Sequence, residues 1–309
     1  MHLPISCRTA TALLLLSVAD CGQASLAGFP YLQIQPDARV ASTAASTVAG
    51  VSGVGGLQLN PASVAGLDDN QAQFLWLDHL QDINYFNTSI SLKRYAPWIL
   101  SAGFSHLGYG SLDGRDEFGV STGSFESQDN LVFVGAAREL GAVRAGANLK
   151  LGWSTIDDAR ASLLAMDLGL QSRVGKDFLL GAALRNAGKV LSDFGSSETP
   201  LPVTLQLGVQ KSLEHLPFTW SLAWEQVKGQ DSNMTVGGEF LVARRWHLGL
   251  GYNFGLGEDR LSAVSGESTR GLSAGLGGRI MEDYHFHWAW NSFGELGALN
   301  RFTISRTFP

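Results

Sequence analysis

The chain has little cysteine, and what it has is confined to its start. Cys7 and Cys21 are the only two cysteines among 309 residues, and both lie within residues 1–27. That stretch has an early positive charge, a leucine-rich apolar core and small residues at plausible cleavage points, so it predicts a cleaved signal peptide. The mature chain would then hold no thiol, which excludes disulfides, thiolate metal ligands and cysteine nucleophiles.

A second way to process the leader is cleavage just before Cys21, as in a lipoprotein. Asp20 occupies the position before that cysteine, where a small residue is normally required. The sequence therefore favours a cleaved leader without a lipid anchor.

Long apolar runs and charged residues are also scarce. After the leader, no run reaches the roughly 18 apolar residues that a membrane helix needs. Charged residues make up only 16% of the chain and the formal net charge is −6, which argues against nucleic acid as a partner. Residence in a membrane would therefore require a closed sheet, because lipid offers no partner for unpaired backbone groups.

Most of the chain shows the two-residue period of β-strands. From Gln71 onward, segments of about ten residues carry apolar side chains at every second position. In residues 203–210, valines and leucines alternate with Thr, Gln and Gly; in 218–225, 248–255 and 284–291, leucines and aromatic residues alternate with small or polar residues. We expect the apolar set to face lipid and the small polar set to face a lumen. A soluble β-sandwich or lipocalin-like barrel is the alternative, but its water-facing side would carry more Lys and Glu.

The joints between the segments differ in length in a regular way. Tight joints lie at 95–97, 140–141, 175–176, 243–244 and 281–282, with a slightly longer one at 214–216. The intervening joints are mostly longer, as at 113–124, 188–200, 255–269 and 291–298. Short turns on one side and long loops on the other predict an outer-membrane β-barrel with both termini in the periplasm.

Counting the segments gives about fourteen antiparallel strands, an even number as single-chain bacterial barrels prefer. We assign residues 118–122 to a long outer hairpin, because a fifteenth strand there would break the alternation of short and long joints. The predicted strands start near Ala72, Asn84, Trp98, Ser124, Ala142, Ala161, Asp177, Leu201, Pro217, Met234, Arg245, Arg270, Asp283 and Leu299.

Residues 28–70 lack the strand period. They hold a stretch of small residues, the glycine-rich run 51–56 and the sequence Asn60-Pro61-Ala62. We expect this segment to fold into the lumen as a plug of short helices and turns. The glycine run lacks the Gly-Lys-Ser/Thr ending and the βαβ context of a phosphate loop, so a nucleotide site is disfavoured. The predicted organisation is thus a leader (1–27), a plug (28–70) and a transmembrane barrel (71–309).

An ordered set of short motifs resembles the PorV/PorQ family of outer-membrane proteins, and its PorQ branch in particular. The motifs are Asp37-Ala38-Arg39, Asn60-Pro61-Ala62, Gly123-Ser124-Phe125 with Asp129, Gly146 with Asn148 and Lys150, Asp167-Leu168-Gly169, Arg185-Asn186-Ala187-Gly188, Leu201-Pro202-Val203 through Gly208, and Leu213 with His215-Leu216-Pro217-Phe218. The resemblance covers essentially the whole mature chain. It implies a fourteen-stranded FadL-like barrel with its N-terminal segment inside.

The same resemblance implies a role at the cell surface in type IX secretion. PorV-like members carry cargo with a C-terminal sorting domain to the attachment complex, and PorQ-like members hold a surface partner of the PorZ type. The family offers no binding motif that can be placed on these loops. The acidic outer-loop residues are therefore only candidates for partner binding: Asp113, Asp116, Asp193, Glu258 and Asp259.

The sequence gives little indication of a metal site or a catalytic site. His285 and His287 share one strand face and could approach one metal ion, but no third ligand is evident, so we interpret them as lumen-lining polar residues. Asp157 with Asp158, and Asp113 with Asp116 and Glu117, lack the ligand spacing of a calcium loop. A phospholipase would need a serine and a histidine that converge on the lipid-facing surface, whereas these histidines face inward. We expect no enzyme activity, no cofactor and no metal.

Two functions remain from the sequence. The first is a secretion and surface-attachment component that docks a PorZ-type protein or sorting-domain cargo through its outer loops. The second is a FadL-like channel that admits hydrophobic small molecules. The ordered motifs that resemble the PorQ branch favour the first. A continuous apolar track through the plug and lumen would favour the second, but the predicted lumenal residues are mainly small and polar. In either case we expect the protein to be surrounded by outer-membrane lipid.

Overall fold

The computed structural model describes residues 28–78, 83–115, 118, 120–195, 199–243, 245–257, 269–294 and 297–309. The predicted leader, residues 1–27, lies outside this set. Fourteen strands dominate the described residues, and the helices are single turns. No helix among them is long and apolar enough to cross a membrane.

The first seven strands are β1 (Asn70–Asp78), β2 (Asn84–Leu92), β3 (Ile99–Arg115), β4 (Ser121–Leu140), β5 (Val143–Ile156), β6 (Ala159–Val174) and β7 (Phe178–Ser192). The others are β8 (Thr204–Ser212), β9 (Phe218–Val227), β10 (Asn233–Val242), β11 (Trp246–Asn253), β12 (Leu272–Arg279), β13 (Tyr284–Ser292) and β14 (Ala298–Phe308). The short helical turns are η1 (Pro30–Gln33), α1 (Ala38–Ser42), η2 (Val54–Gly56), η3 (Pro61–Val64), η4 (Lys93–Tyr95) and α2 (Phe254–Gly257).

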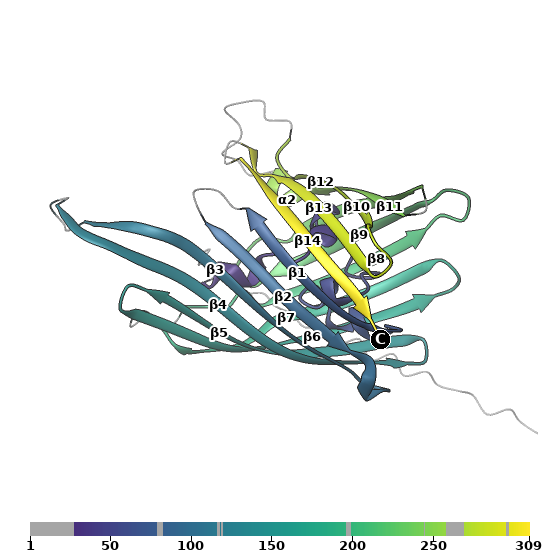
Figure 1. Cartoon of the computed structure of the whole chain (residues 1–309), viewed down its shortest axis with the longest axis horizontal. Helices are drawn as coiled ribbons and strands as arrows, with labels where there is room; N and C mark the ends of the chain where they lie inside the picture. The colour runs from purple at the N-terminus through teal and green to yellow at the C-terminus, as the bar shows by residue number, and fades with distance from the viewer. Residues whose placement is uncertain are drawn as a thin grey trace, which may run out of the picture.

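The strands form one closed antiparallel barrel in which each strand pairs with its neighbours in the chain (Figure 1). The ring closes between β1 and β14, whose register runs from Asn70 opposite Phe308 to Asp78 opposite Asn300. Closure leaves no free sheet edge along this seam, as a barrel in lipid requires. The prediction of an antiparallel fourteen-stranded barrel is confirmed.

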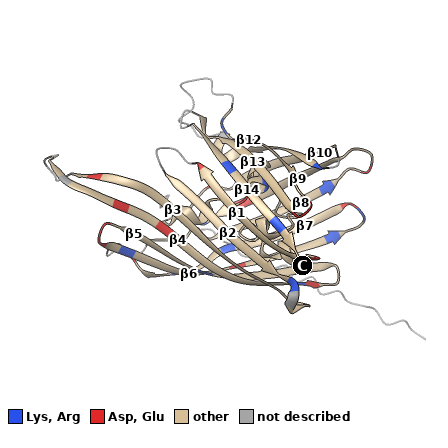
Figure 2. Cartoon of the chain, in the orientation of Figure 1, with Lys and Arg blue, Asp and Glu red and all other residues tan. Residues whose placement is uncertain are grey.

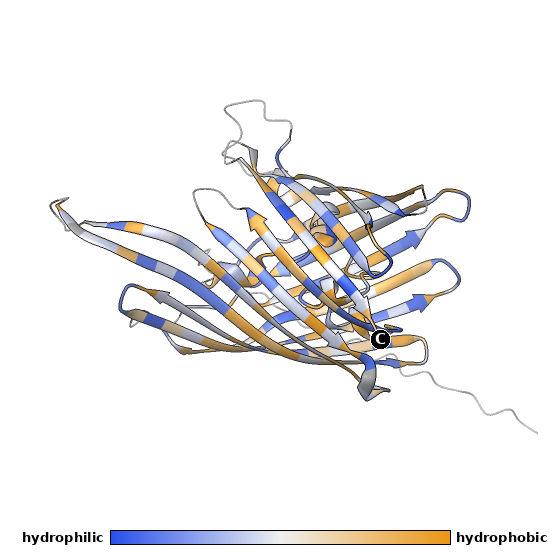
Figure 3. Ribbon diagram, in the orientation of Figure 1, coloured by the Kyte–Doolittle hydropathy of each residue, from blue (hydrophilic) through white to orange (hydrophobic). Residues whose placement is uncertain are grey.

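The two faces of the wall differ as the alternation predicted. On β8, Leu205 and Leu207 are 40% and 45% exposed on the outside, whereas the lumen-facing Thr204 and Gln206 are buried. Leucines, valines and aromatics recur among the exposed residues of most strands, and Figure 3 shows hydrophobic and hydrophilic residues alternating along many of the strands. Charged residues gather toward turns and strand ends, and most of the wall carries none (Figure 2). An apolar outer surface of this kind suits lipid and excludes the soluble barrel.

The connections between strands also alternate between short and long, as predicted, with two exceptions. On the side of the chain ends, turns are tight, as between Leu140 and Val143. On the opposite side β11 and β12 are separated by a long connection, but β5 and β6 are joined by Asp157 and Asp158 alone. Much of the expected loop 113–124 is strand, because β3 and β4 extend into a hairpin that projects beyond the ring (Figure 1). We call the two ends of the barrel the short-turn end and the long-loop end.

Candidate functional site: the lumen and the segment within it

Residues 28–69, here the N-terminal segment, lie among the lumen-facing side chains of the barrel. Donors on many strands reach its backbone carbonyls: Gln73 to Pro36, Asn148 to Leu57, Gln171 to Val51, Gln206 to Ala45 and Asn291 to Ala41, at 2.8–3.1 Å. In the other direction, the Ala38 amide donates to Thr303 Oγ1 at 2.9 Å. Pairing of this kind satisfies the irregular backbone of a segment that is buried away from water.

Asn60 is the most tightly held residue of the segment. Its side-chain amide donates to the Val48 carbonyl at 2.9 Å and to the Leu170 carbonyl of β6 at 3.1 Å, and its Oδ1 accepts from Ala62. Gly146 and Gly169 face this turn, and a Cβ on either would collide with it. The glycines are therefore required by the close approach of the segment to the wall.

The helix α1 is fixed to the wall by an ion pair. The Asp37 side chain caps α1 by accepting from the Val40 amide at 2.8 Å. The Arg39 guanidinium binds both carboxylate oxygens of Glu239 on β10, at 2.7 and 3.0 Å. A bidentate pair of this geometry holds the helix in one position against the sheet.

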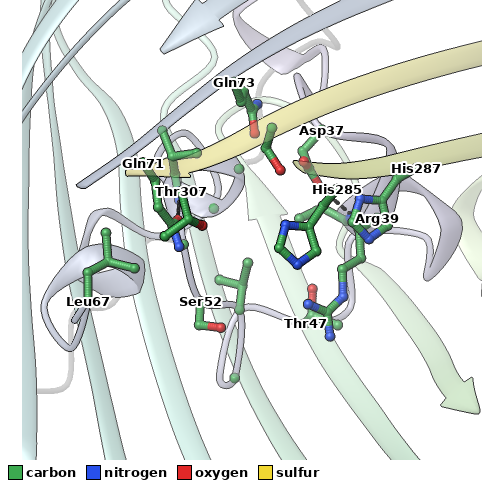
Figure 4. Close-up of a pocket in the computed structure, with 18 of the residues that line it drawn as sticks. Asp37, Arg39, Thr47, Ser52, Leu67, Gln71, Gln73, His285, His287 and Thr307 are labelled. Atoms are coloured by element: carbon green, nitrogen blue, oxygen red, sulfur yellow. Dashed lines mark hydrogen bonds between the residues drawn. The ribbon is translucent and has the colours of Figure 1, made fainter. Parts of the chain in front are cut away.

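A polar cavity of about 220 Å³ lies at the short-turn end of the lumen (Figure 4). Arg39, His285 and His287 line it together with Gln71, and they come from α1, β13 and β1. The prediction that both histidines face the lumen is therefore confirmed. Within the described ranges, no group of three His, Cys, Asp or Glu side chains could hold a metal ion.

The long-loop end of the lumen is apolar instead. We call its buried side chains the outer apolar cluster, which comprises Phe29, Tyr31, Leu32, Leu75, Leu77, Tyr85, Leu107, Leu131, Ala161, Leu163, Ala165, Leu201 and Leu299. The expectation of a mainly small and polar lumen is therefore wrong for this half. The sequence of strand β1 could have indicated this apolar lining, because its run Phe74-Leu75-Trp76-Leu77 is apolar on both faces of the strand.

A buried ionic network lies in the lumen at β5, β6 and β7. Lys150 Nζ lies 2.7 Å from the Asp167 carboxylate, and both side chains are at most 1% exposed. Asn186 completes the network: its side-chain oxygen accepts from Lys150 at 3.0 Å, and its backbone N–H donates to Asp167 at 2.8 Å. The pairing of β6 with β7 shifts register between Met166 and Leu168, so Asn186 sits in a bulge.

Of the candidate docking residues, Asp113 and Asp193 lie in the part of the chain that the structure describes. Asp116, Glu258 and Asp259 lie outside the described residues. Asp113 is exposed on β3, opposite Ser124 in the projecting hairpin.

Asp193 instead stabilises its own loop. Its carboxylate accepts from the Thr199 amide at 2.6 Å, from the Thr199 hydroxyl and from the Phe194 amide. These hydrogen bonds hold the pKa of Asp193 below its usual range. A carboxylate with its acceptor sites occupied in this way has a local structural role.

No protein-family model matches this chain, and no curated protein matches it. The fold is that of solved outer-membrane barrels. The Ralstonia pickettii toluene transporter TbuX has a TM-score of 0.61 at 14% identity, over 88% of this chain and 98% of that chain. The Pseudomonas putida toluene transporter TodX has a TM-score of 0.61 at 12% identity, over 88% and 96%.

A FadL homologue of Pseudomonas aeruginosa has a TM-score of 0.53 at 10% identity, over 88% of this chain and 98% of that chain. At these identities the likeness concerns the fold alone. The chain therefore shares the fold of these bacterial outer-membrane barrels, two of which are named as toluene transporters and one as a FadL homologue. The comparisons give the resemblance to the PorV/PorQ family no support of their own.

Proposed function

We propose that this outer-membrane barrel is a FadL-like channel that admits hydrophobic small molecules at its long-loop end. The observation that carries the proposal is the outer apolar cluster. Inward-facing leucines such as Leu75, Leu107 and Leu131 give this half of the lumen an apolar lining. An apolar lumen wall has no use in a water-filled pore, but it suits a ligand that leaves water for hydrocarbon.

The N-terminal segment occupies this lining as a ligand would. Phe29, Tyr31 and Leu32 are each at most 6% exposed and pack against the leucines of the wall. These side chains precede the first strand, β1, in the chain, so they can be withdrawn without breaking a strand. We propose that the segment is a plug and that a hydrophobic ligand competes with these three side chains.

An entry route is suggested at the seam between β7 and β8. The ladder of β7 with β6 continues to Ser192, but the ladder of β7 with β8 stops at Arg185 opposite Thr204. Beyond that point, Leu201 lies in the outer apolar cluster, and Gly28 donates its amide to the Pro200 carbonyl. The outer part of this seam is thus closed by irregular chain, which can part at less cost than a ladder of paired strands.

The test is binding of the neutral fluorophore 1-N-phenylnaphthylamine by the purified protein in nonionic micelles. We expect saturable binding that toluene displaces, and binding about tenfold tighter or more when residues 28–32 are deleted. The reason is that a buried Phe or Leu contributes about 1.5–3 kcal/mol, which the fluorophore no longer has to displace. Leu216→Asn is the matched control, because Leu216 is exposed in the turn between β8 and β9.

The polar variant Leu131→Asn should weaken binding, because it places an amide in the apolar lining. Electrophoretic mobility before and after heating would establish that each variant is a folded barrel. If neither the full chain nor the deletion binds the fluorophore above empty micelles, the channel proposal fails.

A second function is favoured by the hairpin of β3 and β4. These strands have 17 and 20 residues, against nine in each of β1 and β2. The hairpin projects past its neighbours at the long-loop end (Figure 1) and carries the exposed Leu112. We propose it as the docking element for a surface protein, of the PorZ type or a sorting-domain cargo, if the chain serves secretion.

A further inference from the structure

Charged residues at the strand ends differ between the two ends of the barrel. On the described strands, the charged residues within two positions of the short-turn end are basic, with Glu139 as the exception. We call these basic residues the basic belt: Arg138, Arg144, Arg173, Lys211, Arg279 and Arg306. The same positions at the long-loop end hold both signs, as Asp78, Asp113 and Arg160 show.

Three members of the basic belt, Arg138, Lys211 and Arg306, face outward. Each lies an even number of residues along its strand from an exposed apolar residue, and even spacing keeps side chains on one face of a strand. These exposed residues are Val134 on β4, Leu207 on β8 and Ile304 on β14. The three cations therefore lie on the lipid-facing side of the wall, close to its short-turn rim.

Each of the three outward cations lies over an aromatic ring. The distances from the cation to the ring centre are 5.6 Å for Arg138 over Trp98, 4.7 Å for Lys211 over Phe178 and 5.3 Å for Arg306 over Tyr284. Trp and Tyr side chains prefer the level of the lipid headgroups, so the cations beside them lie at the same depth. A cation over a ring face keeps its N–H donors available for a phosphate oxygen.

None of these three cations forms an ion pair with a carboxylate of the described residues. They lie on β4, β8 and β14, which are spread around the closed ring. A protein that binds one side of the barrel cannot contact all three, whereas a lipid leaflet surrounds the barrel and contacts each of them. The arrangement therefore favours lipid headgroups over an acidic protein as the partner.

We propose that the basic belt binds the phosphate groups of anionic phospholipids in the leaflet around the short-turn end. The outward cations donate hydrogen bonds to phosphate oxygens. The acyl chains pack against exposed leucines further from the rim, such as Leu100 and Leu180. Because short turns of such barrels face the periplasm, this is the periplasmic leaflet, which consists of phospholipids. The proposal does not depend on what the lumen carries.

The test is native mass spectrometry of the purified barrel in nonionic detergent, with dioleoylphosphatidylglycerol and dioleoylphosphatidylethanolamine supplied in equal amounts. We expect complexes with the anionic phosphatidylglycerol to exceed the others by about fivefold or more, because one Lys or Arg near an anionic lipid surface contributes about this factor. The triple variant Arg138→Gln, Lys211→Gln and Arg306→Gln should bind the two lipids equally.

The matched control removes the same number of positive charges from exposed positions nearer the long-loop end and should keep the preference: Arg160→Gln, Lys189→Gln and Lys228→Gln. Electrophoretic mobility before and after heating would establish that each variant is a folded barrel. If the triple variant does not fold, the three single variants decide, and each should lower the preference.

Equal binding of the two lipids by the wild type, or an unchanged preference in the triple variant, would refute the proposal. Inorganic phosphate, compared with chloride at equal ionic strength, should not displace phosphatidylglycerol, because it has no acyl chains to pack against the wall. Displacement by inorganic phosphate would mean that the basic belt binds free anions, and the lipid proposal would be wrong.

Discussion

At the scale of single residues, the motifs that carried the family resemblance hold the N-terminal segment and the wall together. Asn60 meets Gly169, Pro61 meets Gly146, and Asn148 donates to the segment at Leu57. Sequence alone predicted a segment inside a barrel, but not that these motifs would meet. Their contacts join residues about a hundred positions apart, and no period within a strand reveals such a meeting.

The buried pair of Lys150 and Asp167 supports a prediction about stability. We expect Asp167→Asn to lower the free energy of unfolding by about 3–5 kcal/mol, because it leaves a buried ammonium without its counter-charge. The double variant Lys150→Met with Asp167→Leu should be much less damaging, since it removes both charges. Urea unfolding in lipid vesicles, followed by tryptophan fluorescence, measures both.

Asp158→Asn is the control for that series, because Asp158 is exposed in the turn between β5 and β6 and should change stability by about 0.5 kcal/mol or less. An Asp167→Asn variant as stable as this control would mean that the network tolerates the lost charge. Water entering the lumen would then be the physical reason.

At the scale of elements, the strand period and the turn residues were enough to place the fourteen strands. Every predicted start lies within three residues of the observed one, and the largest differences are Ser124 against Ser121 and Leu201 against Thr204. Both occur on the long-loop side. Residues 201–203 satisfy the apolar alternation but belong to irregular chain that covers the β7 seam, so the pattern alone could not exclude them from β8.

The projecting hairpin of β3 and β4 has a prediction of its own. Replacing residues 114–123 by a two-residue Asn-Gly turn should keep the barrel intact, because Asp113 and Ser124 are already paired and this turn matches the twist of paired strands. If the hairpin docks a surface protein, that protein should no longer co-purify from native outer membranes in mild detergent. Quantitative mass spectrometry of the purified samples measures the loss.

The control replaces Asp157-Asp158 by the same Asn-Gly turn, since these residues form another turn at the long-loop end. Retention of the partner after the hairpin change would rule out docking there. A wild-type barrel that purifies without a protein partner would leave the channel as the single function.

At the scale of the whole molecule, the sequence predicted the wall better than the interior. Each strand of the wall needs apolar side chains on its outer face and polar side chains on its inner face. The alternation of apolar and polar residues in the sequence shows this pattern directly. The interior depends on which inward residues meet the N-terminal segment, so the apolar half of the lumen was not foreseen. Sequence favoured docking partly because it took the lumen to be polar throughout, and the outer apolar cluster reverses that preference.

The orientation of the barrel gives the last prediction. Bacterial outer-membrane barrels place short turns in the periplasm and longer loops outside, so Asp158 should face the medium and Glu214, in the β8–β9 turn, the periplasm. A membrane-impermeant maleimide should therefore label Asp158→Cys in intact cells, and Glu214→Cys only after the outer membrane is permeabilised. Because both native cysteines lie in residues 1–27, the wild-type chain should remain unlabelled once the leader is removed.

The labelling pattern also decides where a ligand enters. The outer apolar cluster lies toward the long-loop end, and the polar cavity with His285 and His287 lies at the short-turn end. With the predicted orientation, a molecule from the medium meets the apolar half first and the polar half last. The reverse pattern, with Glu214→Cys labelled in intact cells, would put the apolar half on the periplasmic side and turn the proposed uptake route into an export route.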